Sequence, residues 1–272
     1  MLQEHATPRK RTFSLHWRRP LRLYCAHMQK TLLCLHGWGG SGASFTELRE
    51  ALAGTGITVL APDLPGFGGE PEPPEPWDTD AYADWVTAYI RENVKGTYAL
   101  LGHSHGGRIA IKLAARLAQS KEPLREPTHV FLCAAAGIRH PKHIKRIIGL
   151  TLAKAGKSLL SLPGLRTVKP QAKKLLYKLL RVHDYEQASK VMRQTLINVS
   201  REDMRPLLPY ITVPTDIFWG IDDTMTPLQD GELMQQNIPQ STLHTYQNTR
   251  HRVHRDRAQE IAKIIRRDIE TP

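Results

Sequence analysis

Hydrophobic residues follow two spacings along the chain, short continuous apolar runs and longer stretches with helical periodicity. The short runs are typical of buried strands and lie at Thr31–His36, Ile57–Pro62, Tyr98–His103, Thr128–Ala134 and Thr215–Trp219. The segment Ser241–Tyr246 alternates like a last strand. Helical spacing predicts helices at Ser44–Ala53, Thr79–Asn93, Gly106–Leu117, Leu228–Asn237 and Arg255–Ile269. Two earlier runs, Thr12–Trp17 and Leu21–His27, indicate an opening antiparallel pair. Because strands alternate with helices, we predict an α/β fold with a mostly parallel, twisted sheet covered on both faces.

The alternation stops between Ile138 and Pro206, where three helical stretches are predicted and no strand. They lie near His140–Ala155, Pro170–His183 and Tyr185–Val199. This segment holds 16 Lys or Arg against 4 Asp or Glu, whereas the rest of the chain holds 22 of each. The whole net charge of +12 therefore belongs to one predicted helical segment.

The stretch Lys173–Arg181 places leucines on one helical face and most of its cations on the other. The simpler interpretation is a helix with solvated lysines. The alternative is a surface that attracts anionic substrates or contacts an anionic membrane. We expect no nucleic-acid partner, because no recognisable reading module accompanies the charge.

A pentapeptide of the form Gly-x-Ser-x-Gly, Gly102 to Gly106, joins a predicted strand to a predicted helix. A sharp strand-to-helix turn strains the serine backbone and lifts its hydroxyl clear of the sheet. Glycines are needed on both sides, since a Cβ there would collide with the neighbouring chain. This context favours Ser104 as a nucleophile over a plain glycine-rich turn with a surface serine.

Candidate partners for the serine follow in the chain order Ser, Asp, His. Asp222 and Asp223 come just after the strand Thr215–Trp219, where a carboxylate that orients an imidazole would lie. His251 follows the last predicted strand. This order is that of the α/β-hydrolase catalytic triad. Acyl transfer also needs two N–H donors for an oxyanion, and we assign them to the backbone of His105 and of Trp38 in the loop His36–Gly40.

With these pieces in place, the chain resembles a single-domain α/β-hydrolase of the esterase and lyase-like hydrolase group. The matching segments are His36–Ser41, Pro62–Gly68, Gly102–Gly107 and Pro214–Pro227. The resemblance implies that the acid is Asp223 and that its neighbour Asp222 is the competing carboxylate. In the family a glycine usually precedes the catalytic histidine, and Arg250 stands there in this chain. His254 competes with His251 for the role of base, but in the family's His-x-x-His ending the first histidine is catalytic.

The resemblance also implies a domain organisation. Residues 1–137 and 207–272 would form the hydrolase core, and residues 138–206 would be an all-helical, basic cap over the active site. The tract Glu70–Trp77, rich in proline, would be a stiff loop near the mouth of that site or simply a surface loop.

Composition narrows the setting of the chain. Its 272 residues, 40% of them hydrophobic, suffice for one substantial core. Cys25, Cys34 and Cys133 are an odd number without metal-ligand spacing, so we expect buried free thiols and a reducing compartment. No apolar stretch has the length of a signal peptide or a membrane span, which favours a cytoplasmic location. Neither a metal nor an organic cofactor is expected.

We therefore predict a carboxylesterase-like serine hydrolase that acts on small or medium acyl esters, anionic ones among the options. Ser104 would attack, His251 would transfer the proton, and Asp223 would orient the imidazole. Three alternatives remain open at this point: a hydrolase of carbon–carbon bonds in vinylogous diketones, a perhydrolase or haloperoxidase-like enzyme without cofactor, and a non-catalytic binding protein. The oligomeric state is not readable from the sequence.

Overall fold

The computed structural model describes residues 30–119, 124–140 and 188–270. In these residues six parallel strands form one sheet in the order β2-β1-β3-β4-β5-β6. The strands are β1 (Lys30–Leu35), β2 (Ile57–Leu60), β3 (Thr97–His103), β4 (Val130–Cys133), β5 (Thr215–Gly220) and β6 (Ser241–Tyr246). The central strands β1, β3, β4 and β5 are almost wholly buried, as expected for a parallel sheet covered on both faces. The predicted α/β architecture is confirmed.

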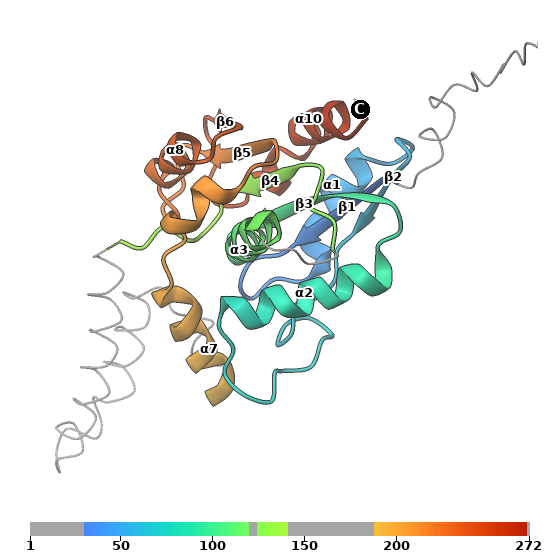
Figure 1. The fold of residues 1–272 in the computed structure, drawn as a ribbon. Coiled ribbons are helices and arrows are strands. Elements are labelled where there is room, and N and C mark those ends of the chain that lie inside the picture. Colours follow the sequence, from blue (N-terminus) through green and yellow to red (C-terminus); the bar gives the residue numbers. More distant parts are fainter. Residues whose placement is uncertain (1–29, 120–123, 141–187, 271–272) are drawn as a thin grey trace, which may run out of the picture.

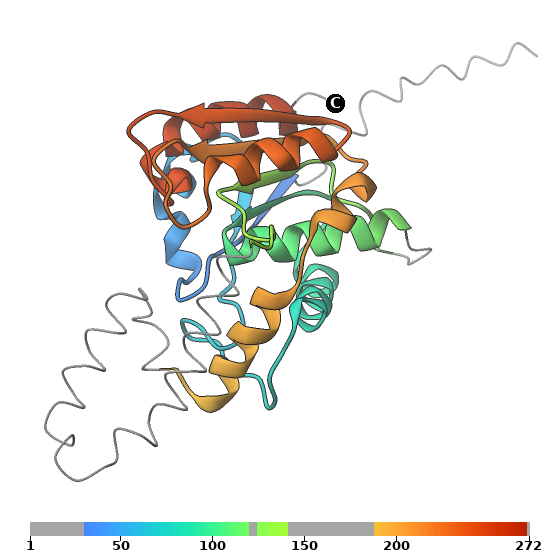
Figure 2. The ribbon, with the colours of Figure 1, turned by 90° about the vertical axis from the view of Figure 1, so that its left-hand side faces the viewer.

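Helices lie on both faces of this sheet (Figure 1). The described helices are α1 (Thr46–Ala51), α2 (Thr79–Asn93), α3 (His105–Gln119), α7 (Lys190–Arg201), α8 (Leu228–Asn237), α9 (Val253–Asp256) and α10 (Ala258–Glu270), with short 3-10 turns at Gly42–Phe45 and Arg205–Tyr210. Figure 2 shows α3 and α2 stacked beneath the sheet, with α10 above it. Helix α1 packs against α10, so these two share the face opposite to α2 and α3.

The strand order brings the candidate chemistry to one edge of the sheet. Parallel strands end at the same edge, and the segments after β1, β3, β5 and β6 carry the loop His36–Gly40, Ser104, Asp223 and His251. Strand β3 lies at the middle of this arrangement, next to β1 and β4. Ligands of open α/β sheets bind at the carboxyl ends of strands, so the topology alone places the candidate site.

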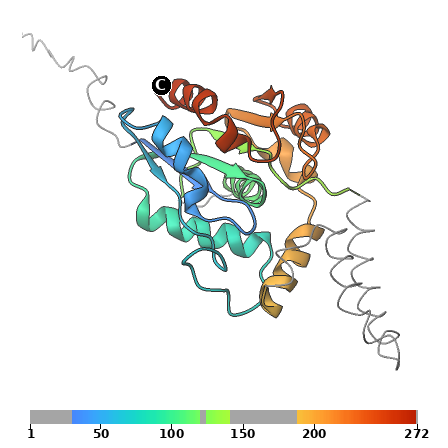
Figure 3. The same cartoon turned by 180° about the vertical axis from the view of Figure 1, so that it is seen from behind.

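Helix α7 lies beside the start of α2, as the view from behind shows (Figure 3). The hydroxyl of Thr195 accepts a hydrogen bond from the backbone N–H of Trp77 at 3.0 Å. The carboxylate of Glu202 accepts one from the N–H of Thr79 at 2.8 Å. The first contact ties the end of the proline-rich tract to α7, and the second ties the first residue of α2 to the C-cap of α7. Helix α7 and its C-cap belong to the segment expected to form the cap.

Several expectations concern residues outside the described ranges. The opening strand pair, Cys25, and the two helices expected between 140 and 183 lie there, as does most of the basic segment. The third expected helix corresponds to α7, which begins five residues later than its pattern indicated. Among the described helices, none is long and apolar enough to cross a lipid bilayer.

Candidate active site

Ser104 occupies a strained turn between β3 and α3. Its φ of 52° lies in the left-handed region that a residue with a Cβ rarely adopts. The turn is held by the Ser104 N–H, which donates to the Cys133 carbonyl at 3.1 Å, and by the Ser104 carbonyl, which accepts from Ala136 at 2.9 Å. The surrounding backbone therefore compensates for the strain and presents the side chain beyond the sheet edge.

The glycines around this serine are required because a side chain would not fit there, and not because the backbone must be flexible. A Cβ on Gly102 would lie 2.4 Å from the carbonyl oxygen of Gly106, and one on Gly106 would lie 2.0 Å from that of Leu35. Both contacts are with backbone, which cannot move aside. The sequence argument for the two glycines is confirmed, and the tight crossing of β1, β3 and α3 is its cause.

His251 and Asp223 form a hydrogen-bonded acid–base pair. Nδ1 of His251 lies 2.7 Å from Oδ2 of Asp223, whose side chain is completely buried. Thr226 donates its hydroxyl to the same Oδ2 at 2.7 Å, and the N–H of Met225 donates to Oδ1 at 2.7 Å. Burial alone would raise the pKa of Asp223, but these bonds, first that from His251, hold its pKa below the usual value. An ionised carboxylate must accept, so the Nδ1–H of His251 is the donor in this bond.

The two competing residues differ plainly from this pair. Asp222 is exposed. His254 is buried, and neither of its ring nitrogens has a hydrogen-bond partner among the described residues. Its ring packs instead against His103, with the centroids 3.9 Å apart.

One cavity of about 520 Å³ brings together all five residues singled out in the sequence, Trp38, Ser104, His105, Asp223 and His251. Its other walls come from the segment after β4, from α7 and from Arg108 on α3. A second, larger cavity of about 700 Å³ is lined by His251 together with His103 and His254. Of these two cavities, Ser104 lines only the first, so the cavity of about 520 Å³ is the candidate site.

The loop after β1 is fixed by a buried histidine and a carboxylate. Nε2 of His36 accepts from the Leu64 N–H at 2.9 Å, and its Nδ1 donates to the Gly37 carbonyl at 2.8 Å. Burial lowers the pKa of His36, which keeps it in this neutral form. Asp63 accepts from the N–H groups of Gly42 and Gly69, at 2.7 and 2.8 Å. These bonds hold the loop that carries Trp38 against the segment after β2, and the Gly106 N–H, which donates to the His36 carbonyl at 3.0 Å, ties it to the start of α3.

The backbone N–H groups of Trp38 and His105 are both left available near Ser104. The N–H groups of Ser104 and Gly106 are used by the carbonyls of Cys133 and His36. For Trp38 and His105, no backbone acceptor is found in the described part of the chain. Their rings contact edge to face, with centroids 5.4 Å apart. The first N–H groups of a helix have no acceptor within it, which makes them natural donors to a developing oxyanion.

Two site residues were not found from the sequence. Arg108 is buried although it sits in a helix whose cations are expected to face water, and it lines the cavity beside Ser104. Asp230 is also buried there, bonded to His140, and burial raises its pKa. Helical periodicity places a residue on a face of its own helix, but it does not show which later segment covers that face.

One group of side chains away from the cavity has metal-ligating character. His129, Asp216 and Asp268 lie near one another toward the amino ends of β4 and β5. Asp216 already accepts hydrogen bonds from His129 and from His244, so its oxygens are satisfied without an ion. This buried network joins strands β4, β5 and β6 at the edge opposite to Ser104.

Comparison with known proteins gives a consistent result. The model of the alpha/beta hydrolase family matches residues 32–264. Pimeloyl-[acyl-carrier protein] methyl ester esterase of Neisseria meningitidis serogroup C is 29% identical over 249 residues, which cover 89% of this chain and 94% of that protein. The protein of the same name from Chromobacterium violaceum is 27% identical over 259 residues, with 88% and 94% covered.

Solved structures match at the level of the fold. An esterase from Exiguobacterium antarcticum superimposes with a TM-score of 0.67 at 22% identity, over 89% of this chain and 92% of that one.

Proposed function

This chain belongs to the alpha/beta hydrolase family, and we propose that it is a serine hydrolase that cleaves carboxylic esters through Ser104, His251 and Asp223. The observation that carries the proposal is the shared cavity: a strained serine and a histidine already oriented by a buried carboxylate open onto the same space. The relatives from Neisseria meningitidis and Chromobacterium violaceum are methyl ester esterases, so methyl esters are the first substrates to test.

The reaction then runs in two halves. Ser104 Oγ attacks the ester carbonyl while His251 Nε2 takes its proton, and the alkoxide leaves as the alcohol when His251 returns that proton. Water repeats the sequence on the acyl-enzyme and releases the acid. Asp223 keeps His251 in the tautomer with Nδ1 protonated and stabilises the imidazolium. The N–H groups of Trp38 and His105 donate to the oxyanion in both halves. Each group is supplied by the protein, so the chemistry needs no metal or organic cofactor.

Residues 138–206 are proposed as the cap of this enzyme, and residues 1–137 and 207–272 as its hydrolase core. Within them, α7 carries Leu196 and Val199 to the wall of the candidate cavity. Its hydrogen bonds to the start of α2 support a covering position. The described core, by contrast, already contains all five proposed catalytic residues.

The test is hydrolysis of p-nitrophenyl esters of graded acyl length, together with plain methyl esters. Ser104→Ala should lower kcat by about 10⁴-fold or more. Ser241→Ala is the matched control, because that hydroxyl bonds the Ile238 carbonyl at the start of β6, away from the cavity. A fluorophosphonate should add its mass to the native protein and not to Ser104→Ala. Turnover that survives in Ser104→Ala would reject the proposal.

The same experiments separate the alternatives. Cleavage of vinylogous diketones with little ester turnover would favour the carbon–carbon hydrolase, and peroxide-dependent chemistry with acetate would favour the perhydrolase. Tight binding of one ligand without turnover of any ester would favour a binding protein.

A further inference from the structure

Arg108 is a buried cation in the wall of the candidate active site. Only 8% of its surface is exposed, and it lines the cavity that contains Ser104. It lies four residues after Ser104, and its N–H donates to the Ser104 carbonyl at 3.1 Å. Both residues line the same cavity, so the side chain of Arg108 faces the space into which Ser104 opens.

The charge of Arg108 is not neutralised by a contacting carboxylate. Among the described residues, the one hydrogen bond of its side chain runs from Nη1 to the backbone carbonyl of Glu202, at 3.0 Å. Burial lowers its pKa to about 10, although Glu202 and Asp203 act from a distance in the opposite direction. A guanidinium remains protonated even so, which leaves a full positive charge in the wall of the cavity.

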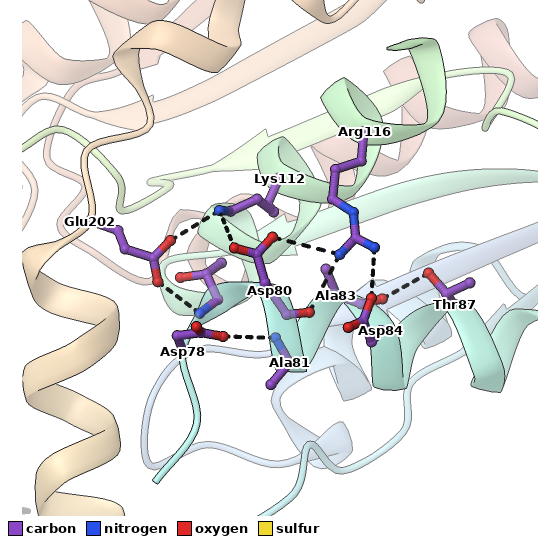
Figure 4. A network of polar contacts seen from close by, with 10 residues as sticks. Asp78, Asp80, Ala81, Ala83, Asp84, Thr87, Lys112, Arg116 and Glu202 are labelled. Atoms are coloured by element: carbon purple, nitrogen blue, oxygen red, sulfur yellow. Dashed lines mark hydrogen bonds and ion pairs between the residues drawn. The ribbon is translucent and has the colours of Figure 1, made fainter. Parts of the chain in front are cut away.

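The nearest acids are engaged elsewhere. Glu202 binds Lys112 at 3.2 Å through one oxygen and the Thr79 N–H through the other (Figure 4). Lys112 also pairs with Asp80, and Asp203 pairs with Arg205. The two carboxylates in the cavity wall, Asp223 and Asp230, are bonded to His251 and His140. A buried charge without a partner costs much more than a paired one, so the pattern calls for an anion supplied from outside.

The free edge of the guanidinium identifies the shape of that anion. With Nη1 held by Glu202, the Nε and Nη2 groups have no hydrogen-bond partner in the described part of the chain. These two N–H groups are parallel and match the two oxygens of a carboxylate.

We propose that the preferred substrate is an ester that carries a second, ionised carboxylate a few bonds from the scissile carbonyl, bound side-on by Arg108. This inference rests on the proposed esterase function and specifies its substrate class. Arg108 is then a specificity residue for the same site. Its bond to the end of α7 explains how it stays in place, but that bond uses only one of its five N–H groups.

The test compares monomethyl esters of succinate, glutarate and adipate with the corresponding dimethyl esters, in which a second methyl ester replaces the carboxylate, and rates are given per ester group. O-acetylglycolate places the carboxylate on the alcohol side instead, and its methyl ester is the neutral counterpart. The wild-type protein should favour one anionic series by about 10- to 100-fold in kcat/KM, mainly through KM. Arg108→Gln should remove that preference, and Arg108→Lys should retain only part of it, since an ammonium lacks the fork.

Arg116→Gln is the matched control, because this arginine lies on the same helix but pairs with Asp84 outside the cavity. If Arg108 had a purely structural role, its replacement would instead lower the melting temperature and reduce the turnover of charged and neutral esters by the same factor. That result, or equal turnover of charged and neutral esters by the wild-type protein, would overturn the inference while leaving the esterase intact. If no ester of either kind is hydrolysed, the proposed function itself fails.

Discussion

Nδ1 of His251 lies 2.7 Å from Oδ2 of Asp223, whereas the adjacent carboxylate, Asp222, is turned to solvent. The difference follows from the turn after β5. The N–H of Asp223 donates to the Gly220 carbonyl at 3.2 Å, and that of Asp222 donates to the Thr249 carbonyl at 3.0 Å. The second bond also fastens the loop that precedes His251. One turn therefore positions both members of the acid–base pair.

Replacement of Asp223 and replacement of Asp222 should have very different effects on kcat. Asp223→Asn should lower kcat by about 10⁴-fold, because an amide can donate to Nδ1 and then stabilises the wrong tautomer of His251. Asp222→Asn should stay within a few-fold of the wild type. Steady-state kinetics on one p-nitrophenyl ester suffices as the measurement. The reverse result would mean that the acid is Asp222.

The hydroxyl of Thr226 should tune this acid. It donates to Asp223 and stabilises the ionised form, so Thr226→Val should raise the pKa of Asp223 and weaken its support of the imidazolium. We expect kcat to fall by about 10-fold with KM little changed. Thr226→Ser, which keeps the hydroxyl, should recover most of the activity. An unaltered kcat in Thr226→Val would show that the bond is dispensable.

Much of this arrangement follows from short-range sequence patterns. The strands and α2, α3 and α8 were predicted nearly to their bounds, because continuous apolar runs and helical periodicity are strong signals in a parallel sheet. The pentapeptide around Ser104 is similarly informative, since a Cβ on either of its glycines would lie only 2.0 to 2.4 Å from a backbone carbonyl oxygen. The sequence could not indicate that Arg108 is buried or that His254 packs against His103. Both depend on segments that close over α3 and β3 from far along the chain.

The loop that carries Trp38 should be sensitive to His36, which lies behind it and touches no substrate in the proposed mechanism. His36→Ala removes both the acceptor for Leu64 and the donor to Gly37, so the proposed Trp38 donor should lose its fixed position. A lost oxyanion donor costs about 10²- to 10³-fold in kcat, and a displaced one should cost up to that amount. KM should change much less than kcat. Equal effects on both parameters, with a large fall in melting temperature, would instead indicate general loss of structure.

The buried histidines should make the folded state sensitive to mild acid. Burial lowers the pKa of His105 and of His254 to about 3, and that of His103 well below its ordinary value. In the unfolded chain all three titrate near pH 6.5. Between these limits the unfolded state binds more protons, so stability falls as pH drops from about 6.5 toward 3. Each such histidine contributes a slope of about 1.4 kcal/mol per pH unit.

Urea denaturation at a series of pH values measures this slope. The free energy of unfolding should be flat above pH 7 with respect to these groups and should decline below it. His254→Phe, which replaces one buried ring by another of similar size, should decline less steeply. A variant that follows the wild-type slope would remove His254 from the explanation.

The described cysteines should be inert in the native protein. Cys34 on β1 and Cys133 on β4 are completely buried, and burial raises the pKa of both thiols far above the usual range. Iodoacetamide at pH 8 should therefore leave Cys34 and Cys133 unmodified, and activity intact, until the chain is unfolded. Cys34→Ala should cost about 1–2 kcal/mol of stability and spare turnover per folded molecule. Rapid modification of either thiol without unfolding would contradict this.

Ionic strength should distinguish the buried arginine from the basic segment. The lysines of that segment, Lys173, Lys174 and Lys178 among them, are expected from the sequence to be solvated, and solvated charges act at a distance that salt shortens to about 10 Å at 0.1 M. If they steer anionic esters, kcat/KM for those esters should fall as salt rises, while neutral esters should not respond. Exchange of the three lysines for Gln should flatten this dependence. The contribution of Arg108 should persist at high salt, because its carboxylate partner would be bound in the wall of the cavity, where screening is weak. Identical salt responses for charged and neutral esters would limit the basic segment to a role in solubility.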